Sequence, residues 1–491
     1  ELNNIKKNIV SFDLNKLHTG ENSSTVIRRK KHNGNLINIK FKSGFSIKLT
    51  PDHKIIDGKN LQWKKTEQFK IGEKVLAPLK LPNNKKEIFV FDILPGEWKV
   101  FLNKDEKKQI KEEVKKRFKK LKIFNEKLGL DKNFLSGTKQ VTIEKFSEIA
   151  NFFGEENDWK NTTLKFGRNK NGEKIKISKI TPELGYLMGF IYGDGHVKID
   201  DRRTNITITQ SVKHKDYIKR FKDCWYKVAL RKLNEYESER TSIIRGKRVI
   251  SKCKVLYCGS NLIGNLYSYY VGHSLKNILC LPDDVLKSFI AGVIDSDGCI
   301  SKRKSIKNGK RYFTQIIEIL FSNKLEDNLN FLLALRRIDC YGKVYNKAKN
   351  IKSIVVSSRE DITNIVNELK PFSVKIGKVD LLTKIKQIPG DSDKIPSLIS
   401  KKICERISSL NKSFLVKKGI WSAIYDLKNL KREPSRSQIM RIIQKTRKEI
   451  DDPGFMDFSL NLIKRDYFLD EIISIKREKY NGYVYDLYVP K

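Results

Sequence analysis

Two stretches of the chain share one hydrophobic pattern. LMGFIYGDGHVK, from Leu187, and FIAGVIDSDGCIS, from Phe289, are apolar runs in which small residues recur every fourth position, and each ends in an acid followed by glycine. Before the first run, Thr181 can cap a helix that has Pro182 at its first position. Before the second run, LPDDVLKSF provides similar start signals. The pattern therefore predicts two helices.

The small residues of each predicted helix lie along one face, because residues four positions apart are neighbours on a helix surface. A glycine inside a helix costs up to about 1 kcal/mol relative to alanine, so such a face needs a packing reason. Close packing of the two helices against each other supplies one. The predicted interface consists of Gly185, Gly189 and Gly193 in the first helix and Ser288, Gly292 and Ser296 in the second.

Asp194 and Asp297 end the two predicted helices, and we expect the following glycines, Gly195 and Gly298, to adopt the left-handed conformation of a helix C-cap. An acid at a helix C-terminus opposes the helix dipole, which a purely structural design would avoid. If the helices pack in parallel, both carboxylates reach the same end of the interface and repel unless cations lie between them. The pattern thus predicts a divalent-metal site, although an ordinary polar cap is the alternative for either copy alone.

The segments after the two helices repeat in the same order. Each helix is followed by a predicted strand, an amphipathic helix, a second strand and a second helix. Asp194 and Asp297 are 103 positions apart, which leaves room for one small domain. The chain therefore contains an internal duplication, and its fold is predicted to be pseudo-two-fold. The corresponding segments are 205–211, 215–228, 254–260 and 261–272 in the first copy, and 315–322, 325–338, 353–358 and 359–372 in the second.

LMGFIYGDG and IAGVIDSDG resemble the two signature helices of the LAGLIDADG homing endonucleases, and the resemblance covers residues 180–385. It implies a double αββαββα domain whose antiparallel strands bind the major groove of DNA. It also implies that the two signature helices form the interface between the repeats. Their terminal acids would then bind Mg²⁺ for cleavage of both strands.

The resemblance assigns roles to further residues. Asp194 and Asp297 are the implied catalytic metal ligands, and backbone carbonyls, at Gly193 and Ser296, would add to an oxygen shell suited to Mg²⁺. Such families also place a basic residue near each acid. Arg359 in the second copy and Lys254 in the first are the candidates for this role.

The two ends of the chain predict a β-rich domain. INIKF and FSIKLT alternate around Lys42-Ser43-Gly44, the pattern of a hairpin, and VYDLYVP near the other end reads as a strand. TPDH contains Thr50 and His53, for which a satisfied structural histidine is the alternative when the motif is taken alone. Together, TPDH and VYDLYV resemble blocks of the intein splicing (Hint) domains. The resemblance implies that Thr50 and His53 polarise the N-terminal scissile peptide bond and that Asp486 is a catalytic acid.

The terminal residues depart from the intein pattern. An intein begins with Cys, Ser or Thr and ends with His-Asn, whereas this chain begins with Glu1 and ends with Pro490-Lys491. Splicing needs a nucleophile at one junction and a cyclising Asn at the other. We therefore expect junctions that are trimmed or degenerate and a chain that does not splice as given. A full-length precursor would excise itself from a host extein.

Two basic segments flank the duplication. KKQIKEEVKKRFKKLKIF and the residues after it predict a small helix-turn-helix unit between about 105 and 154, with a solvated charged linker helix as the alternative. Residues 388–466 predict a helical region whose Lys and Arg add phosphate contacts. The predicted α+β organisation is a splicing domain from 1–84 and 467–491, accessory regions 85–178 and 388–466, and repeats 179–282 and 283–387.

Composition supports a nucleic-acid partner. Lys and Arg number 100 against 57 Asp and Glu, a formal charge of +43, which predicts a polyanionic partner unless the source proteome is generally Lys-rich. No stretch reaches the ~18 apolar residues of a spanning helix and no signal-like segment opens the chain, so we expect a cytoplasmic protein without membrane contact. Seven scattered cysteines without a C-x-x-C pair predict neither disulfides nor a zinc site.

These features together predict a Mg²⁺-dependent, site-specific endodeoxyribonuclease of an intein. We expect it to bind a long, asymmetric DNA duplex as a monomer, because duplication within one chain removes the need for a palindromic site. The alternatives are a DNA-binding protein on the same scaffold and an RNA maturase, both without DNA cleavage. A binding protein would usually have lost one terminal acid, and both are present here.

Overall fold

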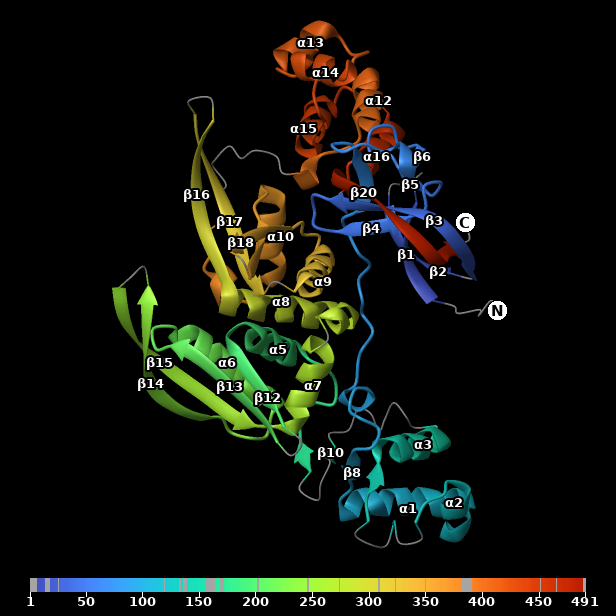
Figure 1. Ribbon diagram of the computed structural model, residues 1–491, viewed down its shortest axis with the longest axis vertical. Helices are drawn as coiled ribbons and strands as arrows, with labels where there is room; N and C mark the ends of the chain where they lie inside the picture. Colours follow the sequence, from blue (N-terminus) through green and yellow to red (C-terminus); the bar gives the residue numbers. More distant parts are fainter. Residues whose placement is uncertain are drawn as a thin grey trace. The chain divides into compact units, whose positions relative to one another are not determined.

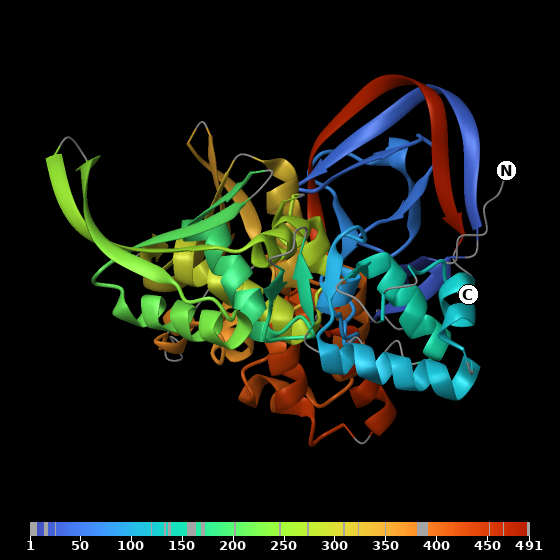
Figure 2. The ribbon, with the colours of Figure 1, turned by 90° about the horizontal axis from the view of Figure 1, so that it is seen from below.

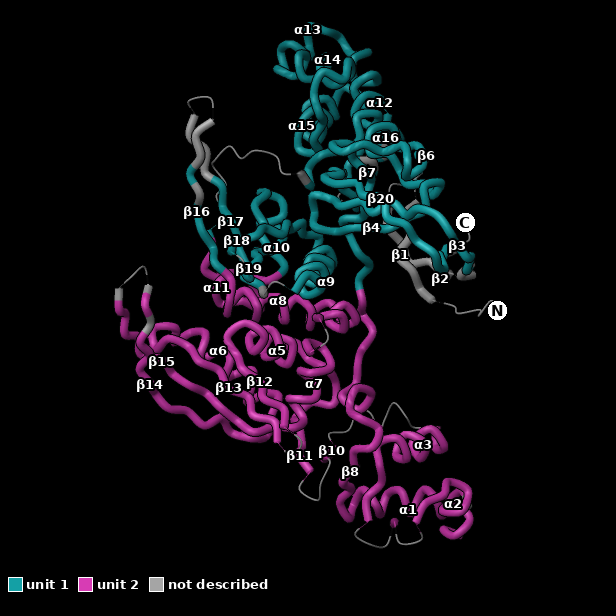
Figure 3. The backbone as a smooth tube through the Cα atoms, viewed as in Figure 1, with its two compact units in different colours: residues 1–83, 299–368, 380–491 teal, residues 84–298, 369–379 magenta. Residues whose placement is uncertain are grey.

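The computed structural model divides into two compact units (Figure 3). The terminal unit contains residues 1–83, 299–368 and 380–491, and the repeat unit contains residues 84–298 and 369–379. Glu1 and Pro490-Lys491, where the sequence departs from the intein pattern, lie outside the described residues. The structure describes residues 7–488 apart from 14–17, 25, 119, 132–133, 136–138, 155–163, 168–171, 201–202, 245–246, 273, 308–309, 323, 349, 381–390, 451 and 465.

The first copy of the duplication lies in the repeat unit. Its four strands form an antiparallel sheet in the order β12-β13-β15-β14. Ile206 and Ile208 of β13 are buried while Asn205, Thr207 and Thr209 are more exposed, so one face of the sheet packs on the helices. The elements are α5 (Pro182–Asp194), β12 (Gly195–Ile199), β13 (Thr204–Ser211), α6 (Lys215–Val228), β14 (Asn234–Ile244), β15 (Lys247–Gly259) and α7 (Asn261–Val271).

The second copy repeats this order of elements. Its helix α8 (Asp283–Asp297) belongs to the repeat unit, and its sheet, in the order β16-β17-β19-β18, belongs to the terminal unit. The predicted duplication is therefore confirmed as two αββαββα runs. The remaining elements are β16 (Gly298–Lys307), β17 (Lys310–Ser322), α9 (Leu325–Arg336), β18 (Lys343–Ala348), β19 (Ile351–Val356) and α10 (Arg359–Leu369), followed by α11 (Val374–Gly377).

The two ends of the chain meet in one sheet of the terminal unit, in the order β4-β3-β20-β7. The last strand, β20, pairs first with β7 and then along most of its length with β3, and Figures 1 and 2 show β3 and β20 as long curved ribbons lying side by side. Gly44 has a φ of +101° in the β3–β4 turn, which confirms the predicted hairpin. The strands are β3 (Val26–Phe41), β4 (Ser46–Leu49), β7 (Lys74–Pro78) and β20 (Tyr467–Tyr488), with the separate pairs β1 (Lys7–Asp13) with β2 (His18–Ser24) and β5 (Lys54–Ile56) with β6 (Trp63–Lys65).

The segment before the first copy differs from the predicted helix-turn-helix unit. Its second and third helices are separated by residues 128–142, which include a strand that pairs with β8. The segment is therefore a small mixed subdomain with a sheet in the order β11-β10-β8-β9. Its elements are β8 (Lys99–Phe101), α1 (Lys104–Phe118), α2 (Leu121–Lys127), β9 (Val141–Thr142), α3 (Ile143–Phe153), β10 (Lys165–Gly167) and β11 (Glu173–Lys174).

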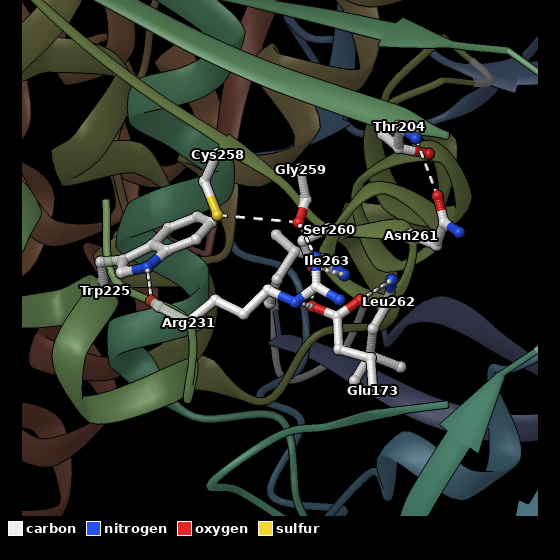
Figure 4. Close-up of polar contacts among 10 residues, drawn as sticks. All are labelled: Glu173, Thr204, Trp225, Arg231, Cys258, Gly259, Ser260, Asn261, Leu262 and Ile263. Atoms are coloured by element: carbon white, nitrogen blue, oxygen red, sulfur yellow. Dashed lines mark hydrogen bonds and ion pairs between the residues drawn. The ribbon is translucent and has the colours of Figure 1, made fainter. Parts of the chain in front are cut away.

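Glu173 connects this subdomain to the first copy (Figure 4). Its carboxylate accepts hydrogen bonds from the Ser260 hydroxyl at 2.5 Å and from the Leu262 backbone N–H at 3.3 Å, both at the start of α7. A carboxylate at a helix N-terminus is favoured by the helix dipole. Asn261, on the same turn, accepts a hydrogen bond from the Thr204 N–H at 2.7 Å, so its side chain joins α7 to β13.

Among the described residues, five helices follow the second copy and form one cluster in the terminal unit (Figure 1). Arg436 fixes this cluster to β20, because its buried guanidinium donates hydrogen bonds to the carbonyls of Ser392 and Tyr467, each at 2.6 Å. Within the described part of the chain, no helix is long and apolar enough to cross a membrane. The five helices are α12 (Ser397–Ile407), α13 (Lys412–Lys417), α14 (Trp421–Lys428), α15 (Arg436–Thr446) and α16 (Pro453–Leu462). The 3-10 turns of the described residues are η1 (Thr66–Gln68), η2 (Val90–Asp92), η3 (Lys276–Cys280) and η4 (Asp391–Asp393).

Candidate active site at the paired helix ends

Helices α5 and α8 pack through their small-residue faces. A Cβ added to Gly185 would lie 2.5 Å from the backbone oxygen of Val285, and Cβ atoms on Gly189 and Gly292 would approach backbone oxygens of the opposite helix even more closely. Only glycine allows the two backbones to come this near at these positions. Ser288 is fully buried in α8.

The same packing brings the C-termini of the two helices together. A Cβ added to Gly193 would collide with the Ser296 side chain and would lie 3.1 Å from Asp297 Oδ2. Asp194 and Asp297 are both half-buried at these ends. The structure therefore places the two predicted acids beside each other.

The predicted left-handed caps at Gly195 and Gly298 are wrong. Gly195 has a φ of −99° and Gly298 a φ of −79°, which any residue can adopt, because each helix passes directly into an extended strand. Glycine is needed there for space instead. A Cβ at either position would lie 2.5 Å from a carbonyl oxygen of the preceding helical turn, that of Ile191 or of Ile294.

Burial and charge make the two acids unusual. Burial raises the pKa of Asp194 to about 6, and the neighbouring Asp297 carboxylate contributes to the rise while Lys375 opposes it. Burial also raises the pKa of Asp297, again against the effect of Lys375. Both carboxyl groups therefore hold protons more tightly than a free aspartate, and a bound cation would relieve the cost of their charges.

Gln210 orients the first acid. Its side-chain amide donates a hydrogen bond to Asp194 Oδ2, so its amide oxygen faces the other way and lies 3.0 Å from His214 Nδ1. Because an amide oxygen can only accept, Nδ1 of His214 carries a proton in this arrangement. Burial and the nearby Lys375 lower the pKa of His214, which favours the neutral ring.

Lys375 is the cation that affects both acids. Its ammonium donates hydrogen bonds to the Ile294 and Gly298 carbonyls, at 2.9 and 2.6 Å, at the C-terminus of α8. A cation is favoured at this end of a helix by the helix dipole. Lys375 thereby offsets the charge of Asp297 at the same helix end.

A buried carboxylate holds Lys375 in place. Asp295 is 1% exposed, and its oxygens accept hydrogen bonds from the backbone N–H groups of Val374 at 2.8 Å and Lys375 at 2.9 Å. The hydroxyls of Ser373 and Tyr186 donate to the same carboxylate, at 2.5 and 3.0 Å. With four donors its charge is well compensated, and the short helix α11 is fixed against α8.

The residues at the helix ends fit a Mg²⁺ site. Magnesium binds through one or two carboxylates and completes its octahedron with water and substrate phosphates. Asp194 and Asp297 provide the two carboxylates, and no cluster of three or more His, Cys, Asp or Glu residues suited to a metal occurs among the described residues. The Ser296 hydroxyl donates within its own helix to Gly292 O and Val293 O, each at 3.0 Å, so the backbone carbonyls of Gly193 and Ser296 remain the predicted additional ligands.

The two predicted basic residues lie on β15 and at the start of α10. Lys254 is the partner of Gln210 in the β13–β15 register, and its ammonium lies 3.3 Å from the carboxylate of Glu235. Arg359 is exposed at the start of α10 in the terminal unit, whereas both acids belong to the repeat unit. Catalytic roles for Lys254 and Arg359 remain predictions.

The predicted splicing residues lie at two places in the terminal sheet: Thr50 and His53 follow β4, and Asp486 lies near the end of β20. Thr50 and His53 form a turn after β4, in which the His53 N–H donates to the Thr50 carbonyl at 3.1 Å, and the Thr66 hydroxyl donates to the His53 carbonyl at 2.7 Å. Ile37 of β3 pairs with Leu49 of β4 on one side and with Arg477 of β20 on the other, so Leu49 and Arg477 lie at the same position along the sheet. Exposed Asp486 lies nine residues further along β20, which is about 30 Å of extended strand.

The Thr50 side chain has a partner within the same turn. Its hydrogen bond to Asp52 lowers the pKa of that carboxyl. Elsewhere in the sheet, the Ser43 N–H donates at 3.1 Å to Asp470, a carboxylate whose pKa burial raises. Asp470 thus fixes the β3–β4 turn to β20.

Sequence reasoning did not find Gln210, His214, Lys375 or the role of Asp295. Gln210 is the second-to-last residue of the predicted strand NITITQS, whose alternation places it on the buried face with Ile206 and Ile208. A polar residue on that apolar face could have indicated a functional position. Lys375 gave no such signal. Its position depends on a hydrogen bond between residues 80 positions apart.

The fold and the site together define a protein whose two chain ends form one splicing-type sheet and whose middle is a duplicated, endonuclease-like LAGLIDADG domain. The sequence model of the intein splicing domain matches residues 1–491, and the chain belongs to this family.

Curated relatives come from Methanocaldococcus jannaschii. Its reverse gyrase is 21% identical over 98% of this chain, and its probable translation initiation factor IF-2 is 26% identical over 76% of this chain. The chain spans only 28% and 30% of the lengths of these relatives.

Solved structures with partial similarity include two DNA complexes. The homing endonuclease I-WcaI bound to its DNA recognition sequence is 14% identical, with coverage of 41% of this chain and 87% of that chain and a TM-score of 0.31. The LAGLIDADG meganuclease I-AabMI bound to uncleaved DNA is 12% identical, with coverage of 39% and 84% and a TM-score of 0.25. The αββαββα assignment above depends on the strand order of this chain alone.

Proposed function

We propose that this chain is a site-specific endonuclease of an intein that cleaves both strands of duplex DNA with Mg²⁺. The observation that carries the proposal is the pair Asp194 and Asp297, which lie side by side at the ends of α5 and α8, with raised pKa values and one lysine beside them. A structural interface has no need for two neighbouring carboxylates at helix C-termini, where the dipole disfavours them.

The side chains around the acids have distinct tasks in this proposal. A divalent metal, when bound, supplies an activated water and neutralises charge on the phosphodiester. Asp194 and Asp297 hold the metal, and Gln210 keeps the Asp194 carboxylate in one orientation. Lys375 carries a positive charge next to both acids and stabilises the negative charge that develops on a phosphate oxygen.

The sheet of the first copy offers a surface for reading bases. Asn205, Thr207, Tyr236 and Tyr257 line a shallow hollow on the face away from the helices. Tyr236 and Tyr257 are 54% and 43% exposed and pack edge to face, with ring centroids 5.9 Å apart. Such amide, hydroxyl and aromatic groups can contact base edges and thymine methyls in a major groove.

We also propose that the chain derives from a precursor that excises itself from a host protein. The chain matches under a third of two relatives with unrelated names, a reverse gyrase and a translation initiation factor. A segment shared by proteins of different function is expected of an intervening sequence. In the precursor, Thr50 and His53 would polarise the N-terminal scissile bond and Asp486 would act near the C-terminal junction.

A cleavage selection tests the endonuclease. The full chain is incubated with Mg²⁺ and a randomised duplex library, and the ends of the products are sequenced. We expect breaks in both strands at one recurring sequence, and we expect Asp194→Asn to abolish them while binding persists in the absence of metal. Asp223→Asn, an exposed acid on α6, is the matched control and should cleave normally. Equal cleavage by Asp194→Asn would contradict the assignment.

A further inference from the structure

Helices α13 and α14 of the terminal unit form a pair with a three-residue connection. Only Lys418, Gly419 and Ile420 join them. Gly419 has a φ of +65°, a conformation that strains other residues, and a Cβ added to it would meet no atom within 4 Å. Two helices joined by a three- or four-residue turn containing glycine are the arrangement of the DNA-binding helix-turn-helix motif.

Buried apolar residues fix the angle of this pair. Leu415 of α13, Ile420 of the turn, and Ile424 and Leu427 of α14 are each no more than 2% exposed. Ile420, Ile424 and Leu427 recur at helical spacing, so one face of α14 packs into the hydrophobic core of the helical cluster. The other members of this core are supplied mainly by α12 and α15, among them Ile403, Ile407, Ile439, Ile442 and Ile443.

The opposite face of α14 is polar and open. Ser422 and Tyr425 lie along it at the spacing of one helix face, and both are exposed. Lys428 is also exposed but lies at the edge of this face, where its ammonium donates a hydrogen bond to the Ser408 hydroxyl at 3.1 Å. Tyr425 is 46% exposed, and the ammonium of Lys431 lies 4.6 Å from its ring centroid. A short serine near the start of α14 leaves room for a partner to approach closely, and an aromatic ring follows one turn further along the helix.

Charge around this face selects one kind of partner. Residues 412–432 contain six basic side chains and one acidic side chain, Asp426, which lies 3.5 Å from Arg432. The basic residues at both ends of the pair can contact phosphates on either side of a groove. The six are Lys412, Lys417, Lys418, Lys428, Lys431 and Arg432.

We propose that α13 and α14 form a second DNA-binding site, in which α14 enters the major groove of duplex DNA and Ser422 and Tyr425 face the bases. In a helix-turn-helix motif the second helix lies in the major groove and the first crosses the backbone. The site is separate from the acids at the ends of α5 and α8, and binding there requires neither metal nor cleavage. It gives the chain a second block of sequence recognition.

The test is a binding selection without divalent metal, so that it does not depend on cleavage. The full chain is used to enrich a randomised duplex library, and the retained DNA is sequenced. We expect two separate conserved blocks for the parent chain. Ser422→Glu places a negative charge and added bulk on the open face of α14, and it should lose one block and weaken binding to the parent-selected duplex by about tenfold or more.

Asn461→Glu is the matched control, because it adds the same charge at an exposed position of α16 in the same helical cluster. It should retain both blocks and full affinity. Tyr425→Ala is a second variant that removes the ring without adding charge, and thermal melting of each variant verifies folding. If both α14 variants fold and enrich the same two blocks as the parent, the proposal is overturned. Enrichment of both blocks without any cleavage in Mg²⁺ would instead reject the endonuclease and leave this site standing.

Discussion

The two copies of the duplication share a scaffold but surround their acids differently. In the first copy, Asp194 is oriented by Gln210, and the position two residues before it is Tyr192. In the second copy, the position two residues before Asp297 is Asp295, a buried carboxylate that fixes Lys375. Duplication therefore preserved the helix packing and the acids, while the amide that orients Asp194 and the carboxylate that fixes the lysine beside both acids each occur in one copy.

The largest effect should come from the acids themselves. Asp194→Asn and Asp297→Asn should each reduce DNA cleavage by at least about 10³-fold, or ~4 kcal/mol of transition-state stabilisation, because each removes half of the carboxylate pair. Single-turnover cleavage in Mg²⁺ measures the loss. If one variant retained most of its activity, the two copies would not contribute equally and the comparison between them would fail.

The helix interface should respond almost as strongly and in both copies. Gly→Ala inside a helix usually stabilises by about 1 kcal/mol, but Gly189→Ala and Gly292→Ala push a Cβ into the opposite backbone and should each destabilise by about 2–3 kcal/mol. Urea denaturation of the full chain gives the free energies. Gly259→Ala, where the nearest atom to an added Cβ is 3.7 Å away, is the control and should change little.

The Asp295–Lys375 connection has no counterpart at the corresponding position of the first copy, which is Tyr192. Asp295→Asn replaces a carboxylate that accepts four hydrogen bonds, so we expect kcat to fall by about 10- to 100-fold with little change in KM for DNA. If Asp295 acts by positioning Lys375, the same substitution made on a Lys375→Ala background should add little. Tyr192→Phe, at the corresponding position of the first copy, should reduce kcat by less than about threefold. Additive losses in the double variant would show that Asp295 acts independently of Lys375.

The smallest expected effect is a pH-dependent difference in stability. Because the folded state raises the pKa of Asp194 from 3.8 to about 6, its contribution to stability is present below pH 4 and is lost as the pH rises through 6. Without metal, Asp194→Asn should therefore gain about 1–2 kcal/mol relative to the parent between pH 4 and 7, after allowance for partial exposure. Asp297→Asn should move the Asp194 transition to lower pH. Denaturation curves in EDTA across this range provide the measurement, and a constant difference would show that folding does not raise the pKa of Asp194.

Local signals predicted the buried elements well and the exposed ones poorly. The helix predicted at 215–228 coincides with α6, because Phe221, Trp225 and Val228 recur on one face and are fully buried. The partner strands β12, β14, β16 and β18 followed only from the family resemblance. Sequences such as NEYESERTSII in β14 carry charges at alternate positions and have no apolar face of their own.

The site was predictable only to the extent that it lies on the signature helices. Asp194 and Asp297 end the same sequence pattern in the two copies, and this repetition indicated that both acids have a function. Lys375 has no motif around it and reaches the site through α11, which is ordered by a carboxylate far away in sequence. The left-handed caps were predicted from the Asp-Gly pairs. A strand begins at each of these glycines, so their backbone is extended instead.

The pairing of β3 with β20 has a consequence for how the chain folds. Phe41 pairs with Ile472, so this sheet cannot close until 431 further residues have been added to the chain, which takes roughly 20–90 s at ordinary rates of synthesis. Closing so long an unstructured loop costs several kcal/mol of chain entropy by the logarithmic rule, and prior folding of the inserted repeats shortens the effective loop. During that interval, the edge of β3 that later pairs with β20 has no partner strand. The run Arg29-Lys30-Lys31 places positive charge on this unpaired strand, which disfavours pairing with strands of other chains during synthesis.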